Sequence, residues 1–572
     1  MCGISGIIGQ KANKENITKM TKALYHRGND AIQQWIEDDV ALGHNRLSII
    51  DLQEASNQPF QKENSHWVLV YNGEIYNYIE LRNELIQKGC TFTTQSDTEV
   101  LYQAFLQWGE ACLERFNGMF AFAFWNTETK ELLAARDRFG VKPFYYYHDE
   151  ENFIFASEIK AIRKLIKTNL NEKLLANYLA FGSYGMLQES FFEEINQLPG
   201  GHFIKLKKSD IEIKQWYDFV SRTNKKILEL QYITENEAKE AYKLLLHDSI
   251  QLRFRSDVPV GFTLSGGVDS SLLLALVNQR EEAKDIKAFT FYTNDERYDE
   301  LPWVEQMVTK TKTQLEKVLL TADEVKERHQ QLSKIQDEPY GGVPTIAYAK
   351  VFETMAKQGI KVILDGQGMD EAWAGYDYYQ NNSNSTIQGQ TNASPFKTNV
   401  LVESFLAKAE KPTYPKPFDD DLLNKQYRDL FYTKITRALR FNDRVSMAST
   451  TELREPFLDY RLVEYAFSLP TKMKIRNNQG KYLLREILSD YSKNLAFAPK
   501  RPLQTPQREW LAEDLSAMVE NAIISIKKSN LAVLFDTQQL QKEWKKYQQG
   551  EQDSSFHIWQ WISVSKLGFN EK

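Results

Sequence analysis

The first part of the chain alternates apolar and polar positions with the period of two that is typical of β-strands. Residues 66–77 (HWVLVYNGEIYN) predict a strand that runs into an Asn-Gly turn, and residues 119–147 predict antiparallel strands around a polar turn, TETK. Residues 97–113 (DTEVLYQAFLQWGEACL) instead place apolar side chains at helical spacing. We therefore expect a sheet-rich α+β domain over residues 1–205.

A different pattern begins after a lysine-rich strip, and helical periodicity dominates from about residue 235. Strands are predicted at 258–264, 286–293 and 361–364, and helices at 270–279 and 348–357. Strands that alternate with helices indicate a parallel sheet with a ligand at its carboxyl edge. We expect a linker over 206–234 and an α/β domain over 235–572, whose last part is largely helical.

Composition narrows the class of protein. The chain has 572 residues, which suggests two domains, and its net charge of -6 argues against a nucleic-acid or anionic-membrane partner. No apolar run approaches the length of a membrane span, and the start lacks the features of a signal peptide. Only three cysteines are present, Cys2, Cys90 and Cys112, without metal-ligand spacing. We expect a cytoplasmic protein without a disulfide framework.

The strongest local motif is FTLSGGVDSSLLLAL. An apolar strand ends at Leu264, and Ser265–Ser271 then turns into a helix. The two glycines allow the backbone to approach a ligand closely, and the helix N-terminus attracts an anion. SGG alone is equally compatible with a plain strand-to-helix turn, and the lysine of a Walker A loop is absent.

Two more acidic loops belong to the same half of the chain. Residues 365–371 (DGQGMDE) follow a predicted strand, and residues 337–339 (DEP) form the other. A single acidic loop is usually only solvated. Together with the glycine motif, however, these loops favour a metal–nucleotide site, because Mg²⁺ prefers carboxylate and phosphate oxygens.

The position of Cys2 suggests a second chemistry. If Met1 is removed, Cys2 carries a thiol and a free α-amine, and the amine can act as a base for its own side chain. Most lone cysteines are buried small hydrophobic residues, and this interpretation suits Cys90 and Cys112. Position alone would be weak support for a nucleophile at Cys2.

The motifs together resemble the glutamine-hydrolysing asparagine synthetases over nearly the full length. The matches in the first half include MCGI, HRGND, GHNRLSIIDL, NGEIYN, SDTE and RDRFGVKP, and those in the second half include VPVGFTLSGGVDSS, LDGQGMDEAWAGY, DRVSMAS and GKYLLRE. The resemblance implies an N-terminal Ntn-hydrolase αββα sandwich, which is a class II glutamine amidotransferase. It also implies a C-terminal PP-loop ATP pyrophosphatase domain, and a homodimer.

The resemblance also implies roles for single residues. In the first domain, Cys2 attacks the glutamine amide, and Asn72 with Gly73 forms the oxyanion hole. The glutamine substrate is held by Arg46, Leu47, Ser48, Glu74 and Asp97. In the second domain, ATP and pyrophosphate are held by Leu264, Ser265, Gly266, Gly267, Asp269, Ser270, Phe291, Asp365 and Gly366. Mg²⁺ is held by Asp269 and Asp370, and Lys481 stabilises charge during adenylation.

The implied reaction hydrolyses glutamine through a thioester, adenylates a carboxylate with ATP, and lets ammonia displace AMP. Aspartate is the first expected acceptor. Gln367, in the catalytic loop, departs from the glutamate that many members carry, and this favours another carboxylate, such as a uronic acid of a surface polysaccharide, as the alternative. We expect residues 500–511 (KRPLQTPQREWL) to shape the acceptor pocket. A third hypothesis, a glutaminase-only or non-catalytic protein, conflicts with the intact motifs.

Overall fold

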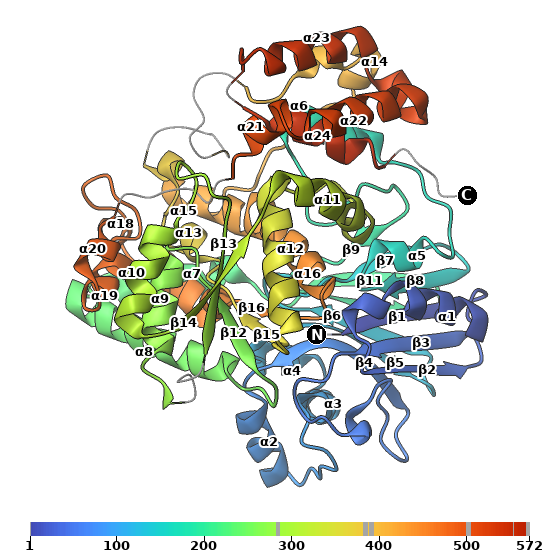
Figure 1. The fold of residues 1–572 in the computed structure, drawn as a ribbon. Coiled ribbons are helices and arrows are strands. Elements are labelled where there is room, and N and C mark those ends of the chain that lie inside the picture. The colour runs from blue at the N-terminus through green and yellow to red at the C-terminus, as the bar shows by residue number, and fades with distance from the viewer. Residues whose placement is uncertain are drawn as a thin grey trace.

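The computed structural model describes residues 2–281, 286–380, 387, 394–498, 505–552 and 554–567. Two antiparallel sheets form the first part of the molecule, at the lower right of Figure 1, and a parallel sheet forms the centre of the second part. The first sheet has the order β2 (Ala31–Glu37), β3 (Val40–Arg46), β1 (Gly3–Gly9), β8 (Asn152–Ala156), β7 (Tyr145–His148) and β9 (Asn196–Gln197). The second has the order β11 (Asp210–Gln215), β10 (His202–Lys207), β6 (Glu131–Arg136), β5 (Gly118–Asn126) and β4 (Trp67–Ile75).

These two sheets pack face to face. Their shared core joins Ile4 and Leu42 of the first sheet to Val70 and Ala123 of the second. Outside the first sheet lie α1 (Lys14–Ala23) and α5 (Ile159–Ile162), and outside the second lie α2 (Tyr78–Gln87) and α3 (Asp97–Trp108). Each sheet thus buries one face on its partner and one on helices. The expected αββα sandwich is confirmed.

The second part is built on a five-stranded parallel sheet with the order β14 (Gln314–Leu319), β13 (Lys287–Tyr292), β12 (Val260–Thr263), β15 (Val362–Leu364) and β16 (Glu452–Arg454). One face is covered by α8 (Glu235–Arg253), α9 (Val268–Val277), α10 (Leu301–Thr311), α17 (Tyr460–Ser468) and α19 (Tyr482–Ser489). The other is covered by α11 (Ala322–Gln336), α12 (Gly342–Lys357) and α16 (Ile435–Met447). The predicted α/β class is confirmed.

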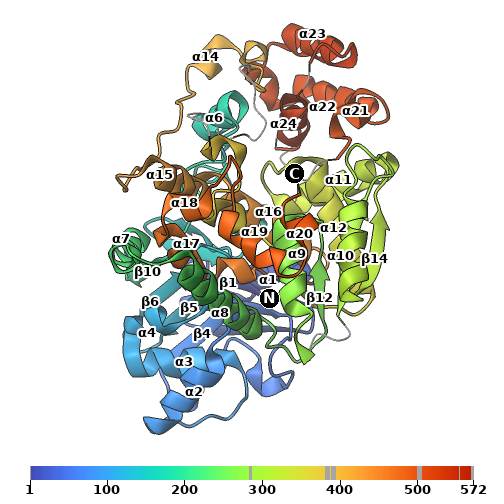
Figure 2. The same ribbon diagram turned by 90° about the vertical axis from the view of Figure 1, so that its left-hand side faces the viewer.

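A group of helices stands above the parallel sheet at the top of Figures 1 and 2. It consists of α14 (Glu403–Leu406), α21 (Gln507–Ala512), α22 (Ser516–Lys528), α23 (Thr537–Gln548) and α24 (Phe556–Val564). Helix α6 (Glu172–Phe181) packs with them, because Leu175 and Tyr178 belong to the same core as Ile558. A segment predicted to belong to the first domain therefore contributes to the covering of the second.

One local prediction was wrong. Asn72 and Gly73 lie inside β4, opposite Ala121 and Phe120 of β5, and do not form a turn. Because β4 continues to pair with β5 through Ile75, the strand runs past the Asn-Gly pair instead of turning there. The range 206–234, predicted as the linker, contains β11, which pairs with β10, and α7 (Phe219–Leu230). The hairpin around TETK and the helix at residue 97 are confirmed. The limits 1–205 and 235–572 stay a prediction.

Candidate active sites

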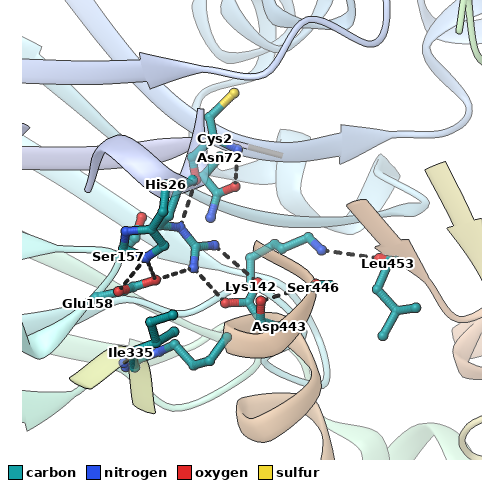
Figure 3. Close-up of polar contacts among 12 residues, drawn as sticks. Cys2, His26, Asn72, Lys142, Ser157, Glu158, Ile335, Asp443, Ser446 and Leu453 are labelled. Atoms are coloured by element: carbon teal, nitrogen blue, oxygen red, sulfur yellow. Dashed lines mark hydrogen bonds and ion pairs between the residues drawn. The ribbon is translucent and has the colours of Figure 1, made fainter. Parts of the chain in front are cut away.

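Cys2 stands at the entrance to β1, beside the strand that carries Asn72. Its backbone N–H donates to Oδ1 of Asn72 at 2.9 Å, and its Sγ lies 3.9 Å from the carbonyl oxygen of Leu47. Figure 3 shows Cys2 and Asn72 side by side. The side chain is buried, and burial raises the pKa of the thiol. A buried thiol of this kind needs a nearby base before it can act as a nucleophile.

Asn72 and Gly73, the two residues predicted to form an oxyanion hole, are adjacent in β4. The Nδ2 group of Asn72 is buried and has no hydrogen-bond partner among the described residues. An unsatisfied buried amide is costly unless it meets an acceptor during function. At Gly73 a Cβ atom would lie 2.1 Å from the carbonyl oxygen of Met119, so only glycine fits the close approach of β5. The side chain of Asn72 thus lies next to Cys2 with the donors of its Nδ2 group unused.

The predicted carboxylate clamp, Arg46, is held rigidly at the end of β3. Its Nη1 donates to the carbonyl oxygen of Gln53 and to Oδ1 of Asn57, both at 2.8 Å, and its Nη2 donates to the carbonyl oxygen of Asp51. The following residues turn past Cys2, where the backbone N–H of Ser48 donates to Asp30. Both Nη groups of Arg46 therefore already donate hydrogen bonds to its own loop. Its role toward glutamine stays a prediction.

The two acidic residues predicted to bind the glutamine ammonium group are both buried. Oδ2 of Asp97 accepts from the Tyr71 hydroxyl at 2.8 Å and from the Ile75 N–H at 3.0 Å. Burial raises the pKa of Asp97 and, more strongly, that of Glu74. Oε2 of Glu74 has no partner among the described residues, whereas Oε1 lies 3.6 Å from Arg454. These carboxyl groups sit where a cationic ligand would lower both pKa values.

Sequence reasoning gave no role to Arg27, although HRGND was one of the matched motifs. Its Nε donates to the carbonyl oxygen of Cys2 at 3.1 Å, and its Nη1 donates to Glu158 at 2.7 Å. Both Nη groups bind the carboxylate of Asp443, at 2.8 and 3.1 Å. Burial alone would raise the pKa of Glu158, but His26, Lys160 and Arg444 hold it well below its ordinary value. Figure 3 shows Glu158 and Asp443, the two carboxylates that pair with Arg27, beneath Cys2.

The glycine motif forms the turn between β12 and α9. Ser270 Oγ accepts from the Ser265 N–H at 3.2 Å and lies 3.3 Å from the Gly267 carbonyl oxygen, to which it donates. Gly266 has a φ of 72°, and a Cβ there would lie 3.1 Å from Trp303. The loop thus presents backbone and hydroxyl groups at the start of a helix, which is a favourable place for an anion.

Lys481 joins two predicted magnesium ligands. Its Nζ lies 2.9 and 2.6 Å from the two oxygens of Asp269, and 2.7 Å from Oδ1 of Asp370. Burial would lower the pKa of Lys481, but the two carboxylates raise it overall. A Cβ at Gly375 would lie 1.9 Å from Asp370 and 2.3 Å from the Cε of Lys481, so glycine is needed for this approach.

A cavity of about 330 Å³ lies above the glycine motif. Its wall contains all the residues predicted to bind nucleotide, namely Leu264, Ser265, Gly266, Gly267, Asp269, Ser270, Phe291, Asp365 and Gly366. Gln367, Asp370 and Lys481 line it too. Asp365 is oriented by Thr263, whose hydroxyl donates to it at 2.6 Å. The structure thus brings together every residue of this predicted set.

The third acidic loop does not join this set. Asp337 pairs with Arg444 at 2.8 Å, and Glu338 pairs with Arg440 at 3.0 Å, away from the wall of the cavity. The expectation that all three acidic loops form one metal–nucleotide site was therefore wrong for residues 337–339. The loop stabilises α16 through buried ion pairs instead.

The donor set suits Mg²⁺ together with phosphate. In the described part of the chain, no group of three or more His, Cys, Asp and Glu side chains could hold a metal ion by itself. Asp269 and Asp370 nevertheless share one ammonium group, and Mg²⁺ is usually bound by one or two carboxylates plus substrate phosphates. The two carboxylates therefore fit an ion that arrives with ATP.

A second and larger cavity, of about 940 Å³, adjoins the first. Gln367, Glu371 and Tyr376 line both cavities and mark their boundary. The Tyr376 hydroxyl donates to Glu371 at 2.7 Å, and burial raises the pKa of Glu371 to about 7. Thr505, Gln507 and Arg508, from the stretch expected to shape an acceptor pocket, line the larger cavity, while residues 500–504 of that stretch lie outside the described residues.

Comparison with known proteins places this arrangement in a family. The description "Glutamine amidotransferase domain" matches residues 1–217, and "Asparagine synthase" matches residues 241–570. The chain belongs to the asparagine synthase family, with an amidotransferase domain of the Ntn-hydrolase type in front of a synthetase domain. None of the helices that the structure describes is long and apolar enough to cross a lipid bilayer.

Three glutamine-hydrolysing asparagine synthetases of Bacillus subtilis strain 168 are similar to this chain. Synthetase 3 is 29% identical and covers 94% of this chain and 92% of its own length. Synthetase 1 is 28% identical, with 91% and 90% covered. Synthetase 2 is 30% identical, with 86% and 70% covered. The likeness extends over both domains.

Proposed function

We propose that this protein is an ATP-dependent ligase that amidates a carboxylate with ammonia taken from glutamine. The acceptor carboxylate oxygen attacks the α-phosphorus of ATP, and pyrophosphate leaves. Ammonia then attacks the acyl carbon, and AMP leaves with the bonding electrons. The proposal is carried by the presence in one chain of two built sites: Cys2 beside the unsatisfied Asn72 amide, and the glycine motif beside Lys481.

In the first half-reaction, removal of Met1 gives Cys2 an α-amine that accepts the thiol proton, and the thiolate attacks the glutamine amide. Nδ2 of Asn72 and the backbone of Gly73 stabilise the developing oxyanion. Arg46 is assigned to the α-carboxylate of glutamine, and Asp97 with Glu74 to its ammonium group. A bound ammonium would favour the charged form of both carboxyl groups, against the burial that raises their pKa values.

In the second half-reaction, Ser265, Gly267 and Ser270 cradle the phosphates at the start of α9. Asp269 and Asp370 would hold Mg²⁺, which neutralises phosphate charge when bound. Lys481 lies between these carboxylates and is assigned to the charge that develops on the α-phosphate. Phe291 and Leu264 border the adenine, and Asp365 and Gly366 contact the nucleotide.

Aspartate is the first acceptor to test, because the similar proteins of Bacillus subtilis are named asparagine synthetases. A larger carboxylic acid, such as a uronic acid, is the second candidate. It is favoured by the position of Gln367 at the mouth of a cavity of about 940 Å³. Both candidates follow the same mechanism and release the same nucleotide products.

The proposal is tested by pyrophosphate release from MgATP in the presence of ammonium, with and without a carboxylate acceptor. We expect release that requires the acceptor. The Cys2→Ala variant should keep this ammonia-dependent release and lose glutamine hydrolysis. Loss of both activities in a folded Cys2→Ala protein, or pyrophosphate release that is indifferent to every acceptor, would refute the assignment of the two sites.

A further inference from the structure

Strand β16 is the last strand in the order of the parallel sheet, and it lies against the amidotransferase domain. Nζ of Lys142 donates to the carbonyl oxygen of Leu453 at 3.4 Å, a contact that Figure 3 shows. The hydroxyl of Thr450, two residues before the strand, donates to the carbonyl oxygen of His26 at 3.2 Å. The synthetase domain therefore meets the amidotransferase domain along this strand.

Arg454, the last residue of β16, has a completely buried side chain that is held on two sides. Its Nη1 donates to the carbonyl oxygens of Arg253 and Arg255, at 2.8 and 2.7 Å, and its Nε donates to Glu452 at 2.6 Å. Its Nη2 is buried and forms no hydrogen bond with any residue that the structure describes. Because a buried donor is costly to leave unpaired, we expect Nη2 to meet an acceptor during function.

The group that faces Nη2 is Glu74, which lies in β4 two residues after Asn72. Oε1 of Glu74 is 3.6 Å from Nη2 of Arg454. Hydrogen bonds between a guanidinium and a carboxylate measure about 2.7–2.9 Å, so a shift of less than about 1 Å would close the contact. Oε2 of Glu74 is also buried and has no hydrogen-bond partner in the described part of the chain. A buried guanidinium and a buried carboxyl group, both incompletely paired, thus stand almost in contact.

The charge of Glu74 depends on this contact. Burial and the charges of Glu452 and Asp97 raise the pKa of Glu74, while the charge of Arg454 opposes them. A closer approach of Arg454 would therefore favour the carboxylate form of Glu74. The carboxylate is the form that attracts the ammonium group of glutamine, to which Glu74 is assigned under the proposed function. The position of one guanidinium thus affects how well this site can hold glutamine.

The main chain of Arg454 contacts the other site. Its carbonyl oxygen accepts from the N–H of Asp365 at 3.0 Å, and Arg454 pairs with Leu364 where β15 and β16 end. Asp365 lines the nucleotide cavity, and its Oδ2 is buried without a hydrogen-bond partner among the described residues. A nucleotide that contacts Asp365 therefore acts one hydrogen bond away from Arg454. A single residue connects the wall of the nucleotide cavity to the predicted glutamine site.

We propose that Arg454 is a positioning residue shared by the two sites, and that nucleotide bound at Asp365 brings its Nη2 within hydrogen-bond distance of Glu74. The amidotransferase site then binds glutamine more tightly when the nucleotide site is filled. Coupling between two binding sites is reciprocal, so bound glutamine strengthens nucleotide binding by the same factor. Glutamine is thus held mainly when ATP is present to use its ammonia. This inference rests on the proposed function, from which it takes both ligands, and it specifies how the two sites are linked.

Calorimetric titrations of the full chain test the coupling. The protein carries Cys2→Ala, so that it binds glutamine without hydrolysing it, and the nucleotide is the Mg²⁺ complex of α,β-methylene-ATP, whose α–β bridge is not cleaved. We expect the saturating analogue to lower the Kd for glutamine by at least about fivefold, and saturating glutamine to lower the Kd for the analogue by the same factor. If both ligands bind without affecting each other, the inference fails and the proposed function stands. If either ligand does not bind, both fail.

Two further substitutions in the same background locate the coupling. Arg454→Met removes the donor, and Glu74→Gln keeps the shape of the acceptor but removes its charge, so each should reduce the coupling to less than about twofold. Because Arg454→Met also breaks the buried ion pair with Glu452, Glu74→Gln decides the outcome if the first variant does not fold. Arg115→Met, which breaks an exposed ion pair with Glu84, is the matched control and should keep the full coupling. Coupling of undiminished size in Glu74→Gln would overturn the assignment of Arg454.

Discussion

Arg27 and Asp443 are 416 positions apart in the chain and form a two-point ion pair at 2.8 and 3.1 Å that is almost closed to solvent. The same guanidinium donates to the carbonyl oxygen of Cys2. Asp443 belongs to α16, and the other end of this helix begins next to Lys434, at the larger cavity. One helix therefore connects the wall of the larger cavity to the backbone of Cys2.

Asp443→Asn tests this connection. Removal of one partner of a buried ion pair typically costs about 3–5 kcal/mol, and the loss of Asp443 should cost near the lower end of this range, because Glu158 still pairs with Arg27. We expect a loss of this size in the free energy of unfolding, measured with urea, and a fall in glutaminase kcat that exceeds the fall in ammonia-dependent synthesis. Asp38→Asn, which removes an exposed pair with Lys130, is the control and should cost at most about 1 kcal/mol. Equal effects of the two substitutions would contradict the role of the buried pair.

Asn72→Ala tests the oxyanion hole. Loss of one preorganised donor typically lowers kcat by about 10²–10³, and the oxyanion exists only in the transition state and the intermediate. We expect this fall in glutamine hydrolysis with a small change in KM for glutamine. Ammonia-dependent pyrophosphate release should persist, because Asn72 lies in the other domain. A variant that changes KM alone would indicate that the amide binds ground-state glutamine instead.

Asp269→Ala tests the glycine motif. The substitution removes a predicted magnesium ligand and one of the two carboxylates that hold Lys481. We expect acceptor-dependent pyrophosphate release to fall below detection, while glutamine hydrolysis at Cys2 continues at a similar rate. Both activities can be measured on one preparation, so a folding defect would be visible as the loss of both. Unchanged pyrophosphate release would exclude this residue from the nucleotide site.

The buried Lys474 predicts a pH dependence of stability. Burial lowers its pKa from 10.5 to about 7, although its Nζ donates to the carbonyl oxygen of Phe467 at 2.8 Å. Between pH 7 and 10.5 the unfolded chain then binds more protons than the folded one, so the free energy of unfolding rises with pH. At 1.36 kcal/mol per pH unit the rise is about 5 kcal/mol.

Unfolding curves of the parent protein and of Lys474→Met, taken from pH 7 to 10, check this prediction. The variant should lose the upward slope that Lys474 contributes. Lys472→Met removes an exposed lysine from the same short helix and should leave the slope unchanged. Parallel curves for the parent protein and Lys474→Met would show that the lysine does not titrate in this window.

The sequence predicted those features that are local in the chain. The strand, glycine turn and helix around Ser265 follow one another directly in the chain. The patterns of apolar positions that predict the two kinds of sheet likewise lie within single segments. Cys2 and Asn72 were predicted together only through the family motifs, since 70 positions separate them. The pattern around Asn72 itself was misinterpreted as a turn, because pairing with β5 is not visible in a single segment.

The sequence could not predict features that depend on distant contacts. The pairing of Arg27 with Asp443 and the placing of α6 beside α24 depend on the packing of the two halves. In the sequence, Lys434 and Arg437 resemble ordinary helix-surface cations. In the structure, both side chains line the larger cavity. The motif that contains Arg27, HRGND, was recognised in the sequence, but its contacts with Cys2 and Asp443 were not predicted.

The central claim is that glutamine nitrogen enters a carboxylate that ATP has adenylated. The most direct measurement follows labels through one reaction that contains MgATP, glutamine labelled with ¹⁵N in its amide, and the preferred acceptor labelled with ¹⁸O in its carboxylate. The account predicts AMP that carries ¹⁸O, unlabelled pyrophosphate, and ¹⁵N in the product amide. Formation of ADP and ¹⁸O-labelled phosphate from ATP, or of AMP without ¹⁸O, would contradict it.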